Sequence, residues 1–127
     1  ERFATIVHKT AFVADSAILE PGAFVMSNCY VGAQARIGQC SLMMANSLVG
    51  HNTTVGPLCH FSVGSITSSY ITIGLCSDVT LGAKVIEKVK IGNFAVAGAG
   101  SLVTRDIPDY EIHVGTPARF MKRVRED

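Results

Sequence analysis

The sequence has little charge and few aromatic side chains. Only 17% of its 127 residues are Asp, Glu, Lys or Arg, 7% are aromatic, and tryptophan is absent. Apolar residues make up 48% of the chain, which excludes the weakly hydrophobic, highly charged composition of disordered chains. The formal net charge of +1 gives no general electrostatic field for a polyanion, so we expect no nucleic-acid partner.

Long apolar runs and paired cysteines are also missing. The uncharged stretches are interrupted by Ser, Asn, Thr and Gly, whereas a membrane helix needs about 20 mostly apolar residues, so we expect no membrane partner. The cysteines, Cys29, Cys40, Cys59 and Cys76, form no CxxC pair and no zinc motif with histidine, so we expect no metal. Free thiols and the lack of a signal-peptide pattern predict a cytoplasmic protein. Because the first residue is Glu1 and not Met, we expect a piece of a longer protein.

A repeat of six residues runs through most of the chain. An aliphatic residue or Phe occupies nearly every sixth position, with Thr67 and Ala97 as the exceptions. The series is Val7, Val13, Leu19, Val25, Val31, Ile37, Met43, Val49, Val55, Phe61, Thr67, Ile73, Val79, Val85, Ile91, Ala97 and Val103. Two residues before each of these positions the side chain is small, except at Ile71 and Val89. Glycine often follows the aliphatic residue, at Gly32, Gly38, Gly50, Gly56, Gly74, Gly92 and Gly98.

The period of six predicts a particular coil. Residues two apart lie on one face of a strand, so the small and the aliphatic residue point into one interior. A corner must follow in each repeat, and we interpret the glycines as residues that tolerate its backbone. Three sides close a triangular coil, and stacked coils pair as parallel strands. We therefore predict an all-β fold, a parallel β-helix of about five to six triangular coils over residues 1–104. The period leaves the hand of the coil open.

The Val-Gly and Ile-Gly repeats, such as Val31-Gly32 and Ile91-Gly92, resemble those of the hexapeptide-repeat acyltransferases. The segment 98–119 resembles the usual ending of that family. The resemblance implies a left-handed parallel β-helix and a homotrimer. Segments 3–8, 49–52 and 59–61 are similar to one branch, the sialic acid O-acetyltransferases and bacillosamine-pathway UDP-amino-sugar N-acetyltransferases. In that branch a small α/β domain that holds the nucleotide sugar usually comes first.

The same resemblance implies two functional histidines. His51 matches the general base, which takes a proton from the sugar amine or hydroxyl as that atom attacks the thioester; imidazole suits this because its pKa lies near neutrality. His60 matches the residue that touches the acetyl end of acetyl-CoA, the co-substrate. Nine residues, one and a half sides of the triangle, separate them, roughly 15 Å across the prism. We therefore expect the active site to form between subunits of a homotrimer.

The residue after the base departs from the family pattern. Several members of the branch have a carboxylate there, whereas this chain has Asn52. An amide can orient the imidazole but cannot stabilise imidazolium by charge. Either the base is weaker here, or another acid supplies the charge, with Asp15, Asp78 and Glu87 as candidates.

A cofactor track is expected at one corner. Val63, Leu81 and Ala99 stand at 18-residue spacing, and the resemblance implies that Leu81 and Ala99 contact acetyl-CoA, largely through their backbone. Gly98 and Gly100 flank Ala99 and open the backbone to close approach. The alternative is that these glycines only make corners.

The remainder, residues 105–127, is predicted as a C-terminal loop, strand and short helix. Thr116 and Pro117 fit an N-cap followed by proline in the first turn, which starts a helix over residues 118–125. Arg119 is expected to hold the CoA phosphates. A solvated terminal helix is the alternative.

These observations favour an acetyl-CoA-dependent acetyltransferase that acts on the amine or hydroxyl of a nucleotide-linked sugar in bacterial glycan synthesis. The alternative is a non-catalytic trimerising β-helix module of a larger protein. A γ-type carbonic anhydrase uses the same coil, but it needs three histidines on one zinc. The four histidines, His8, His51, His60 and His113, include no closely spaced pair.

Overall fold

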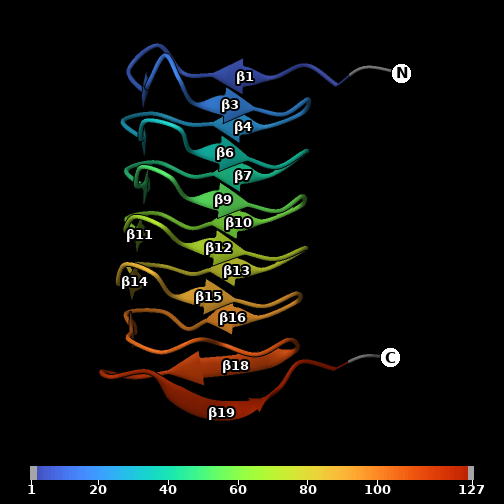
Figure 1. The fold of residues 1–127 in the computed structure, drawn as a ribbon, viewed down its shortest axis with the longest axis vertical. Helices are drawn as coiled ribbons and strands as arrows, with labels where there is room; N and C mark the ends of the chain where they lie inside the picture. The colour runs from blue at the N-terminus through green and yellow to red at the C-terminus, as the bar shows by residue number, and fades with distance from the viewer. Residues whose placement is uncertain (1–2, 126–127) are drawn as a thin grey trace.

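The computed structural model describes residues 3–125, and every regular element in this range is a β-strand. The strands wind into one stack of coils that runs from the N-terminus to the C-terminus along the long axis (Figure 1). They are β1 Ile6–Val7, β2 Phe12–Val13, β3 Ile18–Leu19, β4 Phe24–Val25, β5 Tyr30–Val31, β6 Arg36–Ile37, β7 Leu42–Met43, β8 Leu48–Val49, β9 Thr54–Val55, β10 His60–Phe61, β11 Ile66–Thr67, β12 Thr72–Ile73, β13 Asp78–Val79, β14 Lys84–Val85, β15 Lys90–Ile91, β16 Val96–Ala97, β17 Leu102–Val103, β18 Glu111–Val114 and β19 Arg119–Arg123.

Three parallel sheets form the sides of the coil. Sheet A has the order β1-β4-β7-β10-β13-β16-β18-β19, sheet B has β17-β14-β11-β8-β5-β2, and sheet C has β15-β12-β9-β6-β3. From β1 to β17 the pairing is parallel and paired residues are 18 apart, as in Ile6 with Phe24 and His60 with Asp78. The C-terminal strands depart from this rule, because Ile112 of β18 pairs with Val96 of β16 and β19 runs antiparallel to β18. The predicted parallel β-helix of five to six triangular coils is therefore confirmed. Residues 1–2 and 126–127, the outer ends of the two predicted segments, lie outside the described part.

The interior of the coil is a set of stacked aliphatic side chains. The second residue of each short strand points inward, and from β4 to β17 it is buried, as in Ile37, Phe61 and Ile73. Thr67 occupies an aliphatic position and is also fully buried. Each fully buried Val, Ile or Phe stabilises the fold by ~1.5–3 kcal/mol relative to exposure. The inward ladder that the period predicts is thus the main source of stability.

The repeated glycines have a different role from the one expected. Gly38 and the other glycines that follow an aliphatic residue do not have a positive φ. A Cβ at Gly38 would instead lie on the Gly56 carbonyl group and 2.6 Å from Pro57 N in the next coil. These glycines therefore permit close stacking of backbones, and the interpretation that they tolerate a strained corner is wrong.

The left-handed backbone lies elsewhere in most corners, mainly at residues that have side chains. The residue just before the small inward residue takes a positive φ, for example 58° at Gln34 and 56° at Asn52. The others with side chains are Asn28, Cys40, Asn46, Leu58, Tyr70, Cys76, Lys88, Phe94 and Tyr110. Since this conformation costs an L-residue about 1–2 kcal/mol, the stacked coils must stabilise it.

The predicted C-terminal helix over residues 118–125 is wrong. Arg119–Arg123 form β19, which pairs antiparallel with β18, and Thr116 and Pro117 lie in the turn between them. A helix of eight residues is marginal without packing, whereas the edge of β18 offers unpaired backbone groups. The hairpin also buries Ala118, whose N–H donates to Leu102 O at 2.8 Å, so it covers the C-terminal end of the coil.

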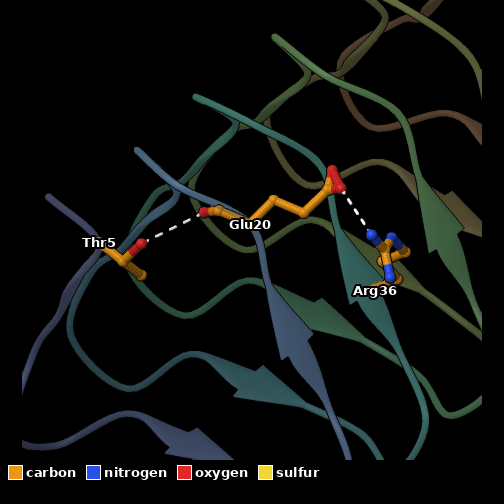
Figure 2. Close-up of polar contacts among 3 residues, drawn as sticks. All are labelled: Thr5, Glu20 and Arg36. Atoms are coloured by element: carbon orange, nitrogen blue, oxygen red, sulfur yellow. Dashed lines mark hydrogen bonds and ion pairs between the residues drawn. The ribbon is translucent and has the colours of Figure 1, made fainter. Parts of the chain in front are cut away.

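Polar contacts join the first coils at the corner that follows sheet C. Thr5 Oγ1 donates to the Glu20 carbonyl oxygen at 3.2 Å, and Arg36 Nη2 donates to Glu20 Oε2 at 3.0 Å (Figure 2). The arginine side chain is 49% exposed, and exposed ion pairs contribute about 0–1 kcal/mol. These contacts therefore add little to the stability that the interior provides.

Candidate active site

His51 stands at the corner between β8 of sheet B and β9 of sheet C, and it is exposed. Its backbone lies close to the preceding coil, because a Cβ at Gly32 would come within 2.6 Å of His51 N. The absence of a side chain at Gly32 thus allows the His51 backbone to stack closely on the preceding coil.

Two amides hold the His51 ring from one side. His51 Nδ1 lies 3.1 Å from Asn52 Oδ1, and Asn52 Nδ2 donates to Gln34 Oε1 at 3.1 Å. With its NH₂ group directed to Gln34, Asn52 presents only an acceptor to the imidazole. This contact is a hydrogen bond in the tautomer that carries its proton on Nδ1, and in that tautomer the second ring nitrogen, Nε2, has a lone pair available.

Tyr70 contacts the same histidine from the next coil. The two rings meet edge to face, with centroids 5.3 Å apart and an interplanar angle of 87°. Tyr70 N also donates to His51 O at 3.1 Å. Gln34, His51, Asn52 and Tyr70, hereafter the His51 cluster, together form a polar and aromatic surface at this corner.

The candidate acids do not reach His51 within the chain. Asp15 and Glu87 belong to the same corner but stand two coils away in either direction, about 10 Å along the axis. Asp78 lies in sheet A, paired with His60. Among residues 3–125 no hydrogen bond or ion pair joins His51 to a carboxylate. A neutral amide is therefore the ring's polar partner.

His60 lies in β10 on the outer side of sheet A, half-buried between Leu42 and Asp78. Its Nε2 atom is buried and has no hydrogen-bond partner in the described part of the chain. Burial raises the pKa of the neighbouring Asp78 carboxyl, and the charge of His60 partly opposes this. Because a buried polar atom without a partner is costly, His60 Nε2 is a candidate to bind a ligand.

The structure does not bring the two histidines together in one chain. His51 stands at the corner between sheets B and C, whereas His60 lies on sheet A. This arrangement agrees with the expected separation. A site that uses both would need a second copy of the chain.

The corner between sheets A and B has an open backbone. Leu81 and Ala99 are exposed there, and within residues 3–125 their N–H groups donate to no acceptor. Gly82 and Gly100 have φ values of 64° and 67°, and a Cβ at either would meet no atom within 4 Å. Gly98 differs, because it is buried and a Cβ there would lie 2.5 Å from the Val114 side chain. Gly98 therefore serves packing beneath β18.

Arg119 lies at the C-terminal end of this corner. It begins β19, it is exposed, and its Nη1 donates to Ala118 O at 2.8 Å. Gly115 O and Ala118 N both bond Leu102, the first residue of β17 in sheet B. The turn before Arg119 thus stacks on the coil that contains Leu102, next to the corner where Leu81 and Ala99 are exposed.

The reasoning from sequence missed Gln34, Tyr70 and Asp78 as neighbours of the two histidines. A signal was present, because Gln34 and Tyr70 lie 18 residues before and after Asn52, and Asp78 lies 18 after His60. No group of three or more His, Cys, Asp or Glu side chains within residues 3–125 is placed to hold a metal ion. The same residues contain no helix able to cross a membrane.

Comparison with known proteins identifies acetyltransferases. No family model matches the chain. A 30-residue stretch is 63% identical to dTDP-3-amino-3,6-dideoxy-alpha-D-galactopyranose 3-N-acetyltransferase of Aneurinibacillus thermoaerophilus, covering 24% of this chain and 16% of that protein. A 51-residue stretch is 47% identical to galactoside O-acetyltransferase of Lactococcus lactis, covering 39% and 25%. The matches thus span a small part of these relatives.

Solved structures match nearly the whole chain. PerB from Caulobacter crescentus, in complex with CoA and GDP-perosamine, superposes with a TM-score of 0.94 at 30% identity, covering 95% of this chain and 58% of that one. The acetyltransferase domain of PglB from Neisseria gonorrhoeae, in complex with acetyl coenzyme A, gives 0.93 at 28% identity, covering 94% and 58%. The chain therefore spans somewhat more than half the length of these neighbours.

These matches establish the class of the fold. The chain is a left-handed parallel β-helix of the kind found in PerB and in the acetyltransferase domain of PglB. The resemblance to hexapeptide-repeat sugar acyltransferases is thereby confirmed, as is the left hand that it implied.

Proposed function

We propose that the protein is an acetyl-CoA-dependent N-acetyltransferase that acts on the amino group of a nucleotide-linked sugar in bacterial glycan synthesis. The observation that carries the proposal is the His51 cluster, which exposes an imidazole with Nδ1 engaged and Nε2 free. Amine acceptors are favoured over hydroxyls because one of the similar structures is a variant of a perosamine N-acetyltransferase from Caulobacter crescentus, 29% identical to this chain.

In the proposed reaction His51 is the general base. The sugar amine attacks the thioester carbonyl carbon of acetyl-CoA, and His51 Nε2 accepts the proton that the nitrogen loses. Collapse of the tetrahedral adduct forms the amide and expels the CoA thiolate, which takes the proton back from the imidazolium. No covalent acyl-enzyme is needed, because both substrates are held together. General-base catalysis contributes about 10²–10⁴-fold to the rate.

The corner between sheets A and B is proposed to hold acetyl-CoA. The free N–H groups of Leu81 and Ala99 donate to carbonyl oxygens of the pantetheine arm, as an added strand would. Gly82 and Gly100 leave room for its close approach. Arg119, at the C-terminal end of this corner, is proposed to pair with the CoA phosphates. His60 Nε2, which is buried and has no partner in the described chain, contacts the acetyl end of acetyl-CoA in this proposal.

A homotrimer completes the proposed site. Outward residues of sheets A and B include exposed Ile6, Phe24, Phe12 and Tyr30, whereas those of sheet C are mostly polar, namely Arg36, Thr54, Thr72 and Lys90. The apolar sides are suited to contact between subunits. Facing sheet A of one chain toward a neighbour brings the neighbour's histidine corner near His60.

The test is a CoA-release assay on the full-length parent protein with a panel of nucleotide-linked amino sugars. We expect His51→Ala to lower kcat by about 10²–10⁴-fold with little change in acetyl-CoA affinity, and His60→Ala to disturb both. His8→Ala, at another exposed histidine, is the matched control and keeps its activity. Light scattering should give a trimer. A trimer that binds no CoA would instead support the non-catalytic module.

A further inference from the structure

We propose that Gln34 is a positioning residue that acts through Asn52 to hold His51 in the Nδ1–H tautomer. The assignment of His51 as the base rests on the proposed function, whereas the tautomer itself does not. The observation is a continuous chain of hydrogen bonds from Gln34 Oε1 to Asn52 Nδ2, and from Asn52 Oδ1 to His51 Nδ1, each 3.1 Å long.

A neutral amide that orients a histidine must itself be held by a second residue. A carboxylate in the same place needs no such partner. Both ends of a carboxylate accept hydrogen bonds, so either end fixes Nδ1–H. An amide has an accepting end and a donating end, and if it turns over it presents NH₂ to the imidazole. Nδ1 would then accept, Nε2 would carry the proton, and Nε2 could not serve as a base. The orientation of Asn52 therefore decides whether His51 has a basic atom exposed.

In the structure Gln34 presents its carbonyl oxygen to the Asn52 NH₂ group, and this contact stabilises the orientation in which Asn52 Oδ1 faces His51. The backbone of Gln34, though not its side-chain amide, is held from the preceding coil, where Gln34 N donates to Ser16 Oγ at 3.0 Å. Ser16, Gln34 and Asn52 follow one another at 18-residue spacing, so the regular stacking of coils sets the geometry. Each coil contributes one polar side chain to the series.

No charged group replaces this arrangement. The ring contacts of His51 in the described chain are the Asn52 amide and Tyr70, and Tyr70 meets the ring edge to face. The nearest carboxylates of the same corner, Asp15 and Glu87, stand two coils away. The tautomer of His51 thus depends on two neutral amides, and on Gln34 for their direction.

The experiment measures the ring nitrogens of His51 by ¹⁵N NMR in the full-length protein without ligand, with His51→Ala to assign the signal. We expect the Nδ1–H pattern in the wild type and in Gln34→Glu, which keeps an acceptor for Asn52. Gln34→Ala should lose the preference for Nδ1–H and lower kcat by about two- to tenfold, the bias that one neutral hydrogen bond provides. The KM for acetyl-CoA should not change. Gln39→Ala, at an exposed glutamine of another corner, should behave as the wild type.

The outcomes separate this proposal from the proposed function. An Nε2–H pattern in the wild type, or the same tautomer in Gln34→Ala as in the wild type, overturns the positioning role whatever the activity. A changed tautomer with unchanged kcat overturns it as well. Full activity of His51→Ala would refute the proposed function, while the tautomer measurement would stand.

Discussion

Replacing Gly38 with alanine should test whether close stacking of backbones explains the repeated glycines. The new Cβ would lie on the Gly56 carbonyl group and 2.6 Å from Pro57 N, where ordinary contacts are 3.4–4 Å. Neither side can yield freely, because Gly56 N donates to Ile73 O at 2.8 Å and Gly56 O accepts from Ser41 Oγ at 2.9 Å. Overpacking of this kind costs about 1–3 kcal/mol or more, and we expect the upper end of that range.

Gly82→Ala is the matched control. Gly82 has a φ of 64°, and its added Cβ would meet nothing within 4 Å, so the expected cost is only the ~1 kcal/mol of a left-handed residue. Urea unfolding and thermal melting followed by circular dichroism, at one protein concentration, measure both. We expect a fall in Tm of ~10 °C for Gly38→Ala and ~4 °C for Gly82→Ala. Equal losses, or a larger loss for Gly82→Ala, would refute the stacking explanation.

Three further predictions concern charge, thiols and the cofactor corner. Burial raises the pKa of Asp78 in the folded protein above its ordinary value of 3.8. Ionisation of Asp78 therefore destabilises the folded state, and the free energy of unfolding of the wild type falls as pH rises from the ordinary pKa to the raised pKa of the folded protein. Asp78→Asn should therefore melt higher than the wild type at pH 7 and equally at pH 3.5; an equal Tm at pH 7 would contradict this. Burial raises the pKa of the Cys59 thiol to about 11, so a thiol reagent at pH 8 should modify Cys59 slowly. Burial also shields Cys29 from the reagent, whereas the half-buried Cys40 and Cys76 should react quickly. Ala99→Trp, at an exposed corner, should keep its Tm and lose CoA binding, whereas Ala95→Trp, in the interior, should unfold the coil; intact CoA titration by folded Ala99→Trp would move the cofactor to another corner.

The coil could be predicted from sequence because its rule is local and repeated. The inward positions, such as Ile37 and Phe61, are set by alternation within a strand and by a corner at a constant interval. The C-terminal hairpin could not be predicted in this way, because β19 forms by pairing with the exposed edge of β18, and residues 118–125 alone have no strand-like alternation that separates them from a helix. The reason for Gly38 also required the structure, since its neighbour Gly56 belongs to the next coil.

The candidate site was predictable only in part. His51 and His60 were found by resemblance, and the structure places them where alternation and corners predict. Counting 18 residues in each direction from Asn52 would have identified Gln34 and Tyr70 as neighbours. The hydrogen-bonded series from Gln34 through Asn52 to His51 could not be predicted, because it depends on side-chain geometry. Whether His51 of one subunit lies near His60 of another depends on how the chains assemble, and a single chain does not determine this distance.

The constant pairing of residues 18 apart also limits how the gene for such a protein can change in length. Deleting one residue within a strand would turn the inward side chain of that strand toward solvent and would misalign the coil that contains it with the coils on either side. Length can change without this penalty in two ways, by bulging a loop from a corner or by adding or removing a whole turn of 18 residues. A duplicated turn would carry its own corner residues with it, and the distance between the His51 corner and the C-terminal hairpin would grow by one strand spacing.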